Sequence, residues 1–314
     1  MKSVIFMGTP DFAVPALECL IKSDEYDVKL VVSQTDKPQG RHQELVAPPV
    51  KQLALQYDIE VYQPKTLKTD EAFEKLASYK PDFIVVAAYG KILPQRVLDI
   101  PVYGCVNLHG SLLPKYRGAA PIQWCVINGE KKTGLTTMMM DAGLDTGDML
   151  LVSETEIGEN ETAGELFDRL AMMGPDLLLR TLSGITAGEI VPVQQKEEDA
   201  TYVSVLSKEM ALIDWKNDAQ TIHNKVRGMA PWPIAKTTFN AKLLKIYSTL
   251  MTRKKTDKAP GSVFSEGDKL FVACGGGTVI EITELQLEGA KKMLPPDFLR
   301  GHQSANGTIL GKQG

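Results

Sequence analysis

Short, almost uninterrupted apolar segments that alternate with helix-like segments limit most strongly how this chain can fold. The clearest of them is Asp-Phe-Ile-Val-Val-Ala-Ala at 82–88, and others lie at 3–8, 28–33 and 104–109. Strands that are apolar on both sides are typical of parallel sheets with helices on both faces. We therefore predict an α/β fold with a mostly parallel sheet for the first part of the chain.

Local signals between these segments predict the connecting elements. After the first strand, Thr9 offers a helix N-cap and Pro10 suits the first helical position. Two further helices are expected near 49–57 and 69–78. The polar stretch 34–49, which contains prolines, predicts a loop that is long enough to suggest a function.

The most regular helical pattern spans residues 162–183. Thr162 and Glu165 have the spacing of a capping box, and leucines and a methionine recur on one face. Gly184 is expected to end this helix.

A change of composition then marks the boundary between two domains, which a chain of 314 residues can accommodate. Residues 185–205 lose helical periodicity and become polar, so we predict a first domain at 1–188, a linker at 189–206 and a second domain at 207–314. In the second domain a helix near 218–229 precedes short strands, which suggest a small β-barrel. These strands are expected at 236–240, 242–248, 261–265, 269–273 and 278–287.

Charge is distributed unevenly along the chain, whose net charge is −4. Residues 1–205 hold 19 basic and 29 acidic side chains, whereas residues 206–314 hold 16 and 10. A basic second domain favours a polyanionic partner. No apolar run approaches the roughly 20 residues of a membrane helix, and Asp11 interrupts the N-terminal apolar stretch too early for a secretory signal. We expect a cytoplasmic protein with no membrane partner.

Nothing in the sequence favours a metal site. The four cysteines lack CxxC spacing and the four histidines are dispersed, so free thiols are expected. Three carboxylates surround two glycines at 140–148, but their spacing does not fit a calcium-binding EF-hand. A carboxylate of this loop that faces His109 is the better interpretation.

The segment 105–114 carries the strongest chemical signal. Asn107 and His109 lie two positions apart on the expected strand, so their side chains share one side, near the strand end where open α/β sheets bind ligands. An amide and a protonated imidazole can both donate hydrogen bonds to a developing oxyanion, and a carboxylate such as Asp145 favours the charged imidazole. The alternative is that Asn107 and His109 only tie down the loop.

Two other chemistries are disfavoured. Ser111 is adjacent to this pair, but no base remains to activate it, so direct attack by a substrate amine is favoured over a covalent intermediate. The turn after the first strand lacks the G-x-G-x-x-G pattern, because positions 10 and 13 are Pro and Ala, which disfavours a dehydrogenase.

Together these motifs resemble the folate-dependent formyltransferase family, whose catalytic Asn, His and Asp match Asn107, His109 and Asp145. The resemblance implies an enzyme with a Rossmann-like catalytic domain and a second domain that is a barrel resembling an OB-fold. It covers nearly the whole chain and also rests on segments 6–13, 86–94, 111–114, 117–122, 145–148, 206–209, 214–215 and 231–233.

The resemblance also implies 10-formyltetrahydrofolate as formyl donor and no metal. The folate would lie between the segment that follows the strand at 82–88, the loop before Asp145, and the segment after His109. The residues implied are Val86, Ala87, Ala88, Tyr89, Gly90, Ile92, Leu93, Ser111, Leu112, Leu113, Pro114 and Asp141.

Within the family, the opening segment and residues 86–94 most resemble the members that formylate tRNA, which implies methionyl initiator tRNA as partner; we expect a monomer. Those members carry a basic loop in the first domain, and the matching segment 36–44 keeps Lys37 and Arg41 but is otherwise not strongly basic. Phosphate contacts are expected in the second domain. The candidates are Lys225, Arg227, Lys236, Lys242, Lys245, Arg253, Lys254 and Lys255.

The mechanism that follows is attack of the unprotonated methionyl α-amine on the formyl carbon. Asn107 and His109 would stabilise the oxyanion, Asp145 would orient His109, and Asp145 or a water that it holds would take up the amine proton. Two alternatives stay open. One is an N-formyltransferase that acts on an amino nucleotide sugar, and the other is a folate- or RNA-binding protein without catalysis.

Overall fold

The computed structural model describes residues 1–39, 44–302 and 305–311. The chain divides into two compact units, and the division differs from the predicted boundaries. Residues as far as Val203 belong to the first unit, although the linker was predicted at 189–206. Two earlier segments, 119–132 and 156–166, belong to the second unit together with 204–314.

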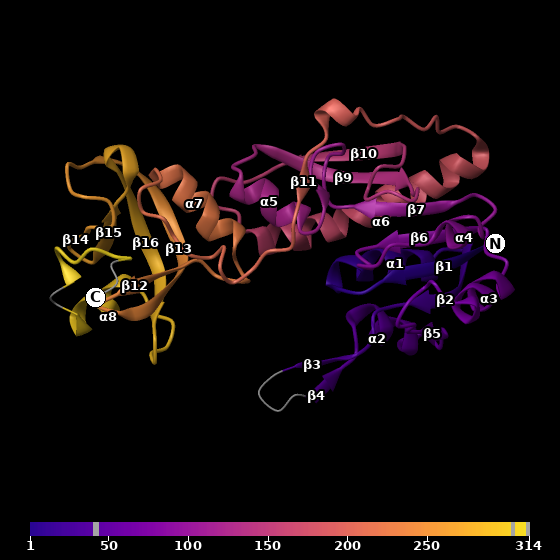
Figure 1. Ribbon diagram of the computed structural model, residues 1–314, viewed down its shortest axis with the longest axis horizontal. Coiled ribbons are helices and arrows are strands. Elements are labelled where there is room, and N and C mark those ends of the chain that lie inside the picture. Colours follow the sequence, from indigo (N-terminus) through magenta and orange to yellow (C-terminus); the bar gives the residue numbers. More distant parts are fainter. Residues whose placement is uncertain (40–43, 303–304, 312–314) are drawn as a thin grey trace. The chain divides into compact units, whose positions relative to one another are not determined.

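The first unit is built on a seven-stranded sheet with the order β10-β9-β7-β6-β1-β2-β5 (Figure 1). The five strands from β7 to β5 pair in parallel, and β9 runs antiparallel to β7, so the predicted, mostly parallel sheet is confirmed. The strands are β1 (Lys2–Gly8), β2 (Tyr26–Val32), β5 (Val61–Tyr62), β6 (Phe83–Ala87), β7 (Cys105–His109), β9 (Lys132–Met139) and β10 (Met149–Glu156).

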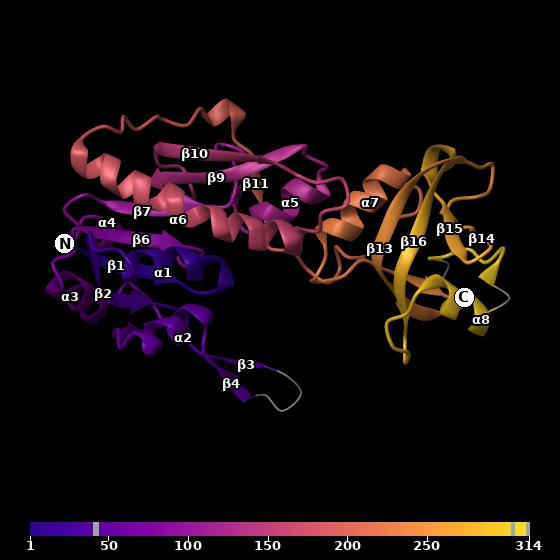
Figure 2. The ribbon, with the colours of Figure 1, turned by 180° about the vertical axis from the view of Figure 1, so that it is seen from behind.

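Helices cover both faces of this sheet. The long helix α6 packs on one face, where a Cβ at Gly174 would come within 2.8 Å of the Leu108 side chain (Figure 2). On the other face, Ala72 and Val97 belong to one buried cluster with Cys105. The helices of this unit are α1 (Val14–Ile21), α2 (Pro49–Gln56), α3 (Asp70–Ser78), α4 (Gln95–Leu98) and most of α6 (Ala163–Ala187).

The entry to the first helix differs from the prediction. A short 3-10 turn, η1 (Asp11–Ala13), precedes α1, and no side chain caps either element, so the prediction that Thr9 is an N-cap is wrong. The Thr9 hydroxyl instead donates a hydrogen bond to the carbonyl oxygen of Tyr89 at 3.2 Å. Thr9 therefore ties the first turn to the segment after β6.

The stretch that was predicted to be a loop contains an antiparallel strand pair, β3 (Lys37–Gln39) and β4 (Glu44–Val46). Three residues pair on each side, although Pro38 lies within β3. Residues 40–43 between the two strands lie outside the described part of the chain. The loop prediction is therefore wrong at both ends of this segment.

The capping box at the start of α6 is confirmed, because the amide of Thr162 donates to the Glu165 carboxylate and the amide of Glu165 donates to the Thr162 hydroxyl. The predicted end at Gly184 is wrong. The helix continues to Ala187, and Gly188 leaves it with a φ of 70°. A Cβ at Gly184 would lie 2.8 Å from Ile190, so Gly184 gives space to the chain that returns over the helix.

The second unit contains a five-stranded antiparallel sheet with the order β12-β13-β16-β15-β14, and each predicted strand is present. Asp218 caps α7 by accepting a hydrogen bond from the Thr221 amide at 2.7 Å. Trp215, Ile222 and Phe239 lie in the core of this unit. Its elements are α5 (Pro121–Ile127), α7 (Ala219–Gly228), β12 (Lys236–Phe239), β13 (Lys242–Lys255), β14 (Val263–Glu266), β15 (Lys269–Ala273), β16 (Thr278–Leu287) and α8 (Pro295–Gly301).

Helix α5 explains why an early segment belongs to the second unit. It packs against α7 so closely that a Cβ at Gly228 would lie 2.5 Å from the Ile127 side chain. Ile122 and Val126 are buried. None of the helices in the described part of the chain has the length and apolar character of a membrane span.

Candidate active site

Strand β7 presents the two polar side chains that the sequence singled out. Leu108 faces α6, so its neighbours Asn107 and His109 point to the opposite face of the sheet. They are only 8% and 6% exposed. A polar pair at the carboxyl end of a central strand, largely removed from water, is placed where open α/β sheets bind ligands.

The hydrogen bonds of His109 distinguish its two ring nitrogens. Nε2 lies 3.0 Å from the carbonyl oxygen of Tyr116, which can only accept, so Nε2 carries a hydrogen. Nδ1 lies 3.8 Å from a carboxylate oxygen of Asp145. Nδ1 is therefore the nitrogen that is not bonded to the backbone, and it faces the carboxylate.

The Asp145 carboxylate is held by the backbone of a neighbouring turn. The amide of Gly118 donates to Asp145 Oδ2 at 2.8 Å. Gly118 has a φ of 101°, and a Cβ there would lie 2.5 Å from the carbonyl oxygen of Val203. Only glycine fits this position without strain, so the chain brings a backbone donor close to the carboxylate.

The Asn107 amide has no hydrogen-bond partner among the described residues, although its side chain is almost buried. An unpaired donor in a site that excludes most water can bind a developing negative charge strongly. The structure thus brings His109 and Asp145 together and leaves the Asn107 amide available on the same side of β7. The catalytic role of these three residues remains a prediction.

The segment after β6 runs beside this strand end, because Val86 on β6 pairs with Asn107 on β7. Val86 and Ala87 are buried at the end of β6. Ala88 is exposed with a φ of 48°, and the exposed Gly90 has a φ of 79°. Ile92 is 69% exposed. The predicted folate residues in this segment therefore include an exposed, partly apolar stretch.

Tyr89 and Leu93, from the same prediction, face the core instead. Tyr89 is 1% exposed, its hydroxyl has no partner among the described residues, and burial raises its pKa to about 12. Its carbonyl oxygen accepts hydrogen bonds from Thr9 and from the Gln34 amide. These contacts fix the path of the backbone.

The predicted folate residues after β7 form a tight turn. The buried Ser111 donates to the carbonyl oxygen of Lys115 at 2.7 Å, and Leu113 is also buried. Leu112 and Pro114 are partly exposed. Asp141 is exposed, and its carboxylate accepts hydrogen bonds within its own loop, from the Gly143 amide and the Thr146 hydroxyl.

The sequence did not predict one residue that supports the backbone around Asp145. Gln195 lies in the predicted linker, yet it is 8% exposed and bonds to the turn that carries Asp145. A second buried side chain, Arg117, was noticed only as part of a motif and bonds to Gln195. The polar run around Gln195 gives no signal by which the sequence alone could have found it.

The predicted phosphate contacts occupy different environments. Lys37 is exposed on β3, and Arg41 lies outside the described residues. Lys225 donates to the carbonyl oxygen of Leu212 at 2.5 Å, and burial lowers its pKa. Lys236 is partly exposed on β12.

Arg227 is buried, at 6% exposed, and the structure gives it a structural role. Its guanidinium donates to the Asn224 side chain and to the carbonyl oxygens of Gly158 and Glu161. These donors are occupied within the unit, so we leave Arg227 out of the proposed phosphate contacts.

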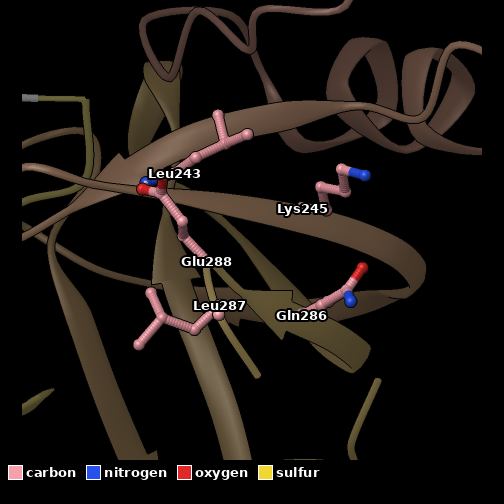
Figure 3. A pocket seen from close by; sticks show the side chains of 6 residues that line it. Leu243, Lys245, Gln286, Leu287 and Glu288 are labelled. Atoms are coloured by element: carbon pink, nitrogen blue, oxygen red, sulfur yellow. The ribbon is translucent and has the colours of Figure 1, made fainter. Parts of the chain in front are cut away.

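A pocket of about 210 Å³ lies in the second unit (Figure 3). Lys245 on β13 and Gln286 on β16 line it and face one another across the paired strands. Glu288 accepts a hydrogen bond from the Leu243 amide at its rim. The pocket contains no counterpart of the His109–Asp145 pair and therefore offers no comparable chemistry.

Comparisons with known proteins agree with this geometry. The family described as "Formyl transferase" matches residues 1–182, and "Formyl transferase, C-terminal domain" matches residues 205–303. A methionyl-tRNA formyltransferase of Acetivibrio thermocellus is 48% identical over 98% of this chain and 99% of its own length. One of Clostridium botulinum is 50% identical over the same shares.

Solved structures share the fold at lower identity. The N-formyltransferase from Helicobacter canadensis, in complex with folinic acid and dTDP-3-aminofucose, superposes with a TM-score of 0.68 at 20% identity and covers 93% of this chain and 100% of its own. The methionyl-tRNA formyltransferase from Clostridium thermocellum gives 0.57 at 18% identity, with 91% and 99% covered. Because both family regions match and close relatives cover nearly its full length, the chain belongs to the formyl transferase family.

Proposed function

We propose that this chain transfers the formyl group of 10-formyltetrahydrofolate to the α-amino group of methionyl initiator tRNA. The observation that carries the chemistry is the His109–Asp145 pair, at 3.8 Å, on the same side of β7 as the amide of Asn107, which has no hydrogen-bond partner within the described ranges. The observation that favours this acceptor is the name of the relatives that are 48–50% identical over nearly the whole chain.

In the proposed reaction the uncharged amine of the methionyl group attacks the formyl carbon. Negative charge develops on the formyl oxygen, and the Asn107 amide and the protonated Nδ1 of His109 donate hydrogen bonds to it. The bond between the carbon and N10 of the folate then breaks. The proton that the amine loses, taken up by Asp145 or a water that it holds, balances the proton that N10 gains.

The charge of Asp145 has a defined task in this scheme. His109 Nε2 already donates to Tyr116, so only Nδ1 is free to act on the substrate. The Asp145 carboxylate lies 3.8 Å from this nitrogen and can orient the ring. The same carboxylate is held by the Gly118 amide, so it keeps its place when the imidazole changes charge.

For the folate, we propose the exposed part of the segment after β6 as one wall of its site. Ala88 and Gly90 are exposed in left-handed conformations, and Ile92 offers an exposed apolar side chain. This stretch is adjacent to Asn107 through the pairing of β6 with β7. A flat, largely apolar ring system suits such a wall, whose backbone groups are open to hydrogen bonding.

For the tRNA, we propose contacts to phosphates by exposed basic residues of the second unit, a monomeric enzyme and a location in the cytoplasm. Affinity should then fall steeply as salt rises, because phosphate contacts release counterions. The exposed candidates among the described residues are Lys242, Arg253, Lys254 and Lys255.

The deciding experiment measures formyl transfer from 10-formyltetrahydrofolate to methionyl initiator tRNA and, in parallel, to a 4-amino nucleotide sugar. We expect transfer to the tRNA alone, with a KM that rises with salt. His109→Ala should lose on the order of 10²–10³ in kcat, the usual cost of one oxyanion donor. Transfer to the sugar alone would keep the chemistry and overturn the acceptor, and near-normal turnover of His109→Ala would overturn the role of the pair.

A further inference from the structure

We infer that Gln195 is a positioning residue, which holds the turn of Asp145 so that its carboxylate faces His109. The predicted effect on catalysis rests on the proposed function. The positioning itself rests on contacts within the first unit. Gln195 lies 50 positions away from Asp145 in the chain and has no place in the proposed chemistry itself.

The Gln195 side chain uses its whole amide on the surroundings of the site. Nε2 donates to the carbonyl oxygens of Asp145 at 2.8 Å and Gly147 at 2.7 Å. Oε1 accepts from Nε of Arg117 at 3.0 Å. The residue is 8% exposed, so water does not readily replace these partners.

These contacts require an amide. Two carbonyl oxygens need two donors, and an arginine needs an acceptor, and glutamine supplies both from one planar group. A glutamate at position 195 has the same shape but only acceptors. It would place a carboxylate against the carbonyl oxygens of Asp145 and Gly147.

The turn that Gln195 holds needs support from outside. Asp145 has a φ of 54°, a left-handed conformation that a non-glycine residue rarely adopts without over-determined surroundings. Gly147 fits so tightly that a Cβ would lie 1.8 Å from the carbonyl oxygen of Met139. Without the two hydrogen bonds that Gln195 donates, fewer interactions would hold the Asp145 backbone in this conformation.

The segment that follows Gln195 also supports His109, the other member of the His109–Asp145 pair. Strand β11 (Tyr202–Val203) pairs in parallel with β8 (Arg117–Gly118), and the Thr201 hydroxyl accepts from the Tyr116 amide at 2.8 Å. Tyr116 accepts from His109, and Gly118 donates to Asp145. Residues 195–203, which we call the strap, therefore contact the supports of both His109 and Asp145.

A displaced Asp145 should affect turnover more than substrate binding. A misplacement of about 1 Å in a catalytic site can cost on the order of 10²-fold in rate. A change that only loosened the fold would alter stability without this separation of kcat from KM.

The experiment compares Gln195→Met and Gln195→Glu with the neighbouring control Gln194→Met, whose residue is exposed. We expect the two variants at 195 to lower kcat by about 10–10²-fold, with little change in KM for folate or tRNA. Hydrogen exchange of the amides from 141 to 148 and of Gly118 should become faster in both. The control should match the wild-type protein in every measurement.

The two proposals fail in different ways. If the wild-type protein does not formylate the tRNA, the proposed function is wrong, and faster exchange in the Gln195 variants still establishes the positioning contact. If the wild-type protein is active but Gln195→Met keeps its kcat and exchange rates, the positioning role is wrong. A loss of stability with an unchanged kcat would also overturn it, since it would leave Gln195 only a structural task.

Discussion

Two buried arginines, one in each unit, have different kinds of hydrogen-bond partner. Arg117 is 1% exposed, and its guanidinium donates to the carboxylate of Glu197 at 2.7 Å and to the Tyr202 hydroxyl at 2.6 Å. Arg227 is 6% exposed, and its partners among the described residues are neutral oxygens, those of the Asn224 amide and of two backbone carbonyls. The guanidinium of Arg117 thus bonds directly to an anion, whereas that of Arg227 bonds to dipoles and feels the charge of Glu161 without a direct hydrogen bond to that carboxylate.

The difference appears in the direction of each pKa. Burial opposes the charge of Arg117, but Glu197 and Tyr202 outweigh it and raise the pKa of the guanidinium. Burial lowers the pKa of Arg227. The comparison teaches that Arg117 links the strap to the active site through a charge pair, whereas Arg227 organises the interior of its unit. The two should therefore fail differently when they are replaced.

The largest effect is expected for Arg227→Met. Removal of the guanidinium takes its donors away from the Asn224 side chain and from the carbonyl oxygens of Gly158 and Glu161 in a buried place, which should cost on the order of 3–5 kcal/mol of the free energy of unfolding. Denaturation in urea measures this, with the exposed Arg253→Met as control, which should stay within about 0.5 kcal/mol. Unchanged stability together with a raised KM for tRNA would instead restore Arg227 as a phosphate contact.

Arg117→Met should come next, with a different signature. Gln195 Oε1 loses the donor that Arg117 supplies, and the strap loses its charge pair, so kcat should fall by roughly 10²-fold, equivalent to about 2.7 kcal/mol. Single-turnover rates well below the unfolding temperature measure the chemical step. Arg180→Met, at an exposed pair on α6, is the control. An equal rate in Arg117→Met and wild type would remove the contrast between the two arginines.

A smaller effect concerns pH. His223 is 2% exposed, and burial lowers its pKa, with a further contribution from the charge of Arg227. The unfolded chain then binds the proton more readily, so the free energy of unfolding should be full above about pH 6.5 and decline as the pH falls below it. Urea midpoints at pH 7.5 and 5.5 test this. His223→Gln should have a flatter profile, and an unchanged slope would mean that another group is responsible.

The smallest effect is expected for Glu197→Gln. The Glu197 side chain is 71% exposed, and solvent strongly screens an ion pair with so exposed a partner. The amide oxygen can still accept from Arg117, so kcat should change by less than about threefold. The steady-state rate at low and high salt is the measurement. If Glu197→Gln lowered kcat as much as Arg117→Met, the charge of Glu197, and not the hydrogen bonds of the Arg117 guanidinium, would hold the strap in place.

Much of this arrangement could be predicted because the signals are local. The apolar run at 82–88 gave β6, and the two-residue spacing of Asn107 and His109 placed both on one side of β7. Thr162 and Glu165 defined the start of α6. Each of these signals rests on residues that are close in sequence and on a period that the backbone imposes.

The misses involve contacts between distant segments. Gln195 stands in a polar run, and its partners lie 48 to 78 positions away, so no periodicity or spacing reveals that it is buried. Gly184 looks like a helix end, but it lies inside α6, where its lack of a side chain leaves space for Ile190. Arg227 has the composition of a phosphate contact, and only the burial of α7 shows that its donors are occupied.

The interleaving of the two units has a consequence for the order in which the chain matures during synthesis. All strands of the large sheet have been made once Val203 has been added, so the first unit can complete its core early. Residues 119–132 and 156–166 have by then also been synthesised, but the part of the second unit on which they pack begins only at Ser204. The buried face of α5, with Ile122 and Val126, therefore waits for α7, and a nascent chain paused in this interval would display it to chaperones.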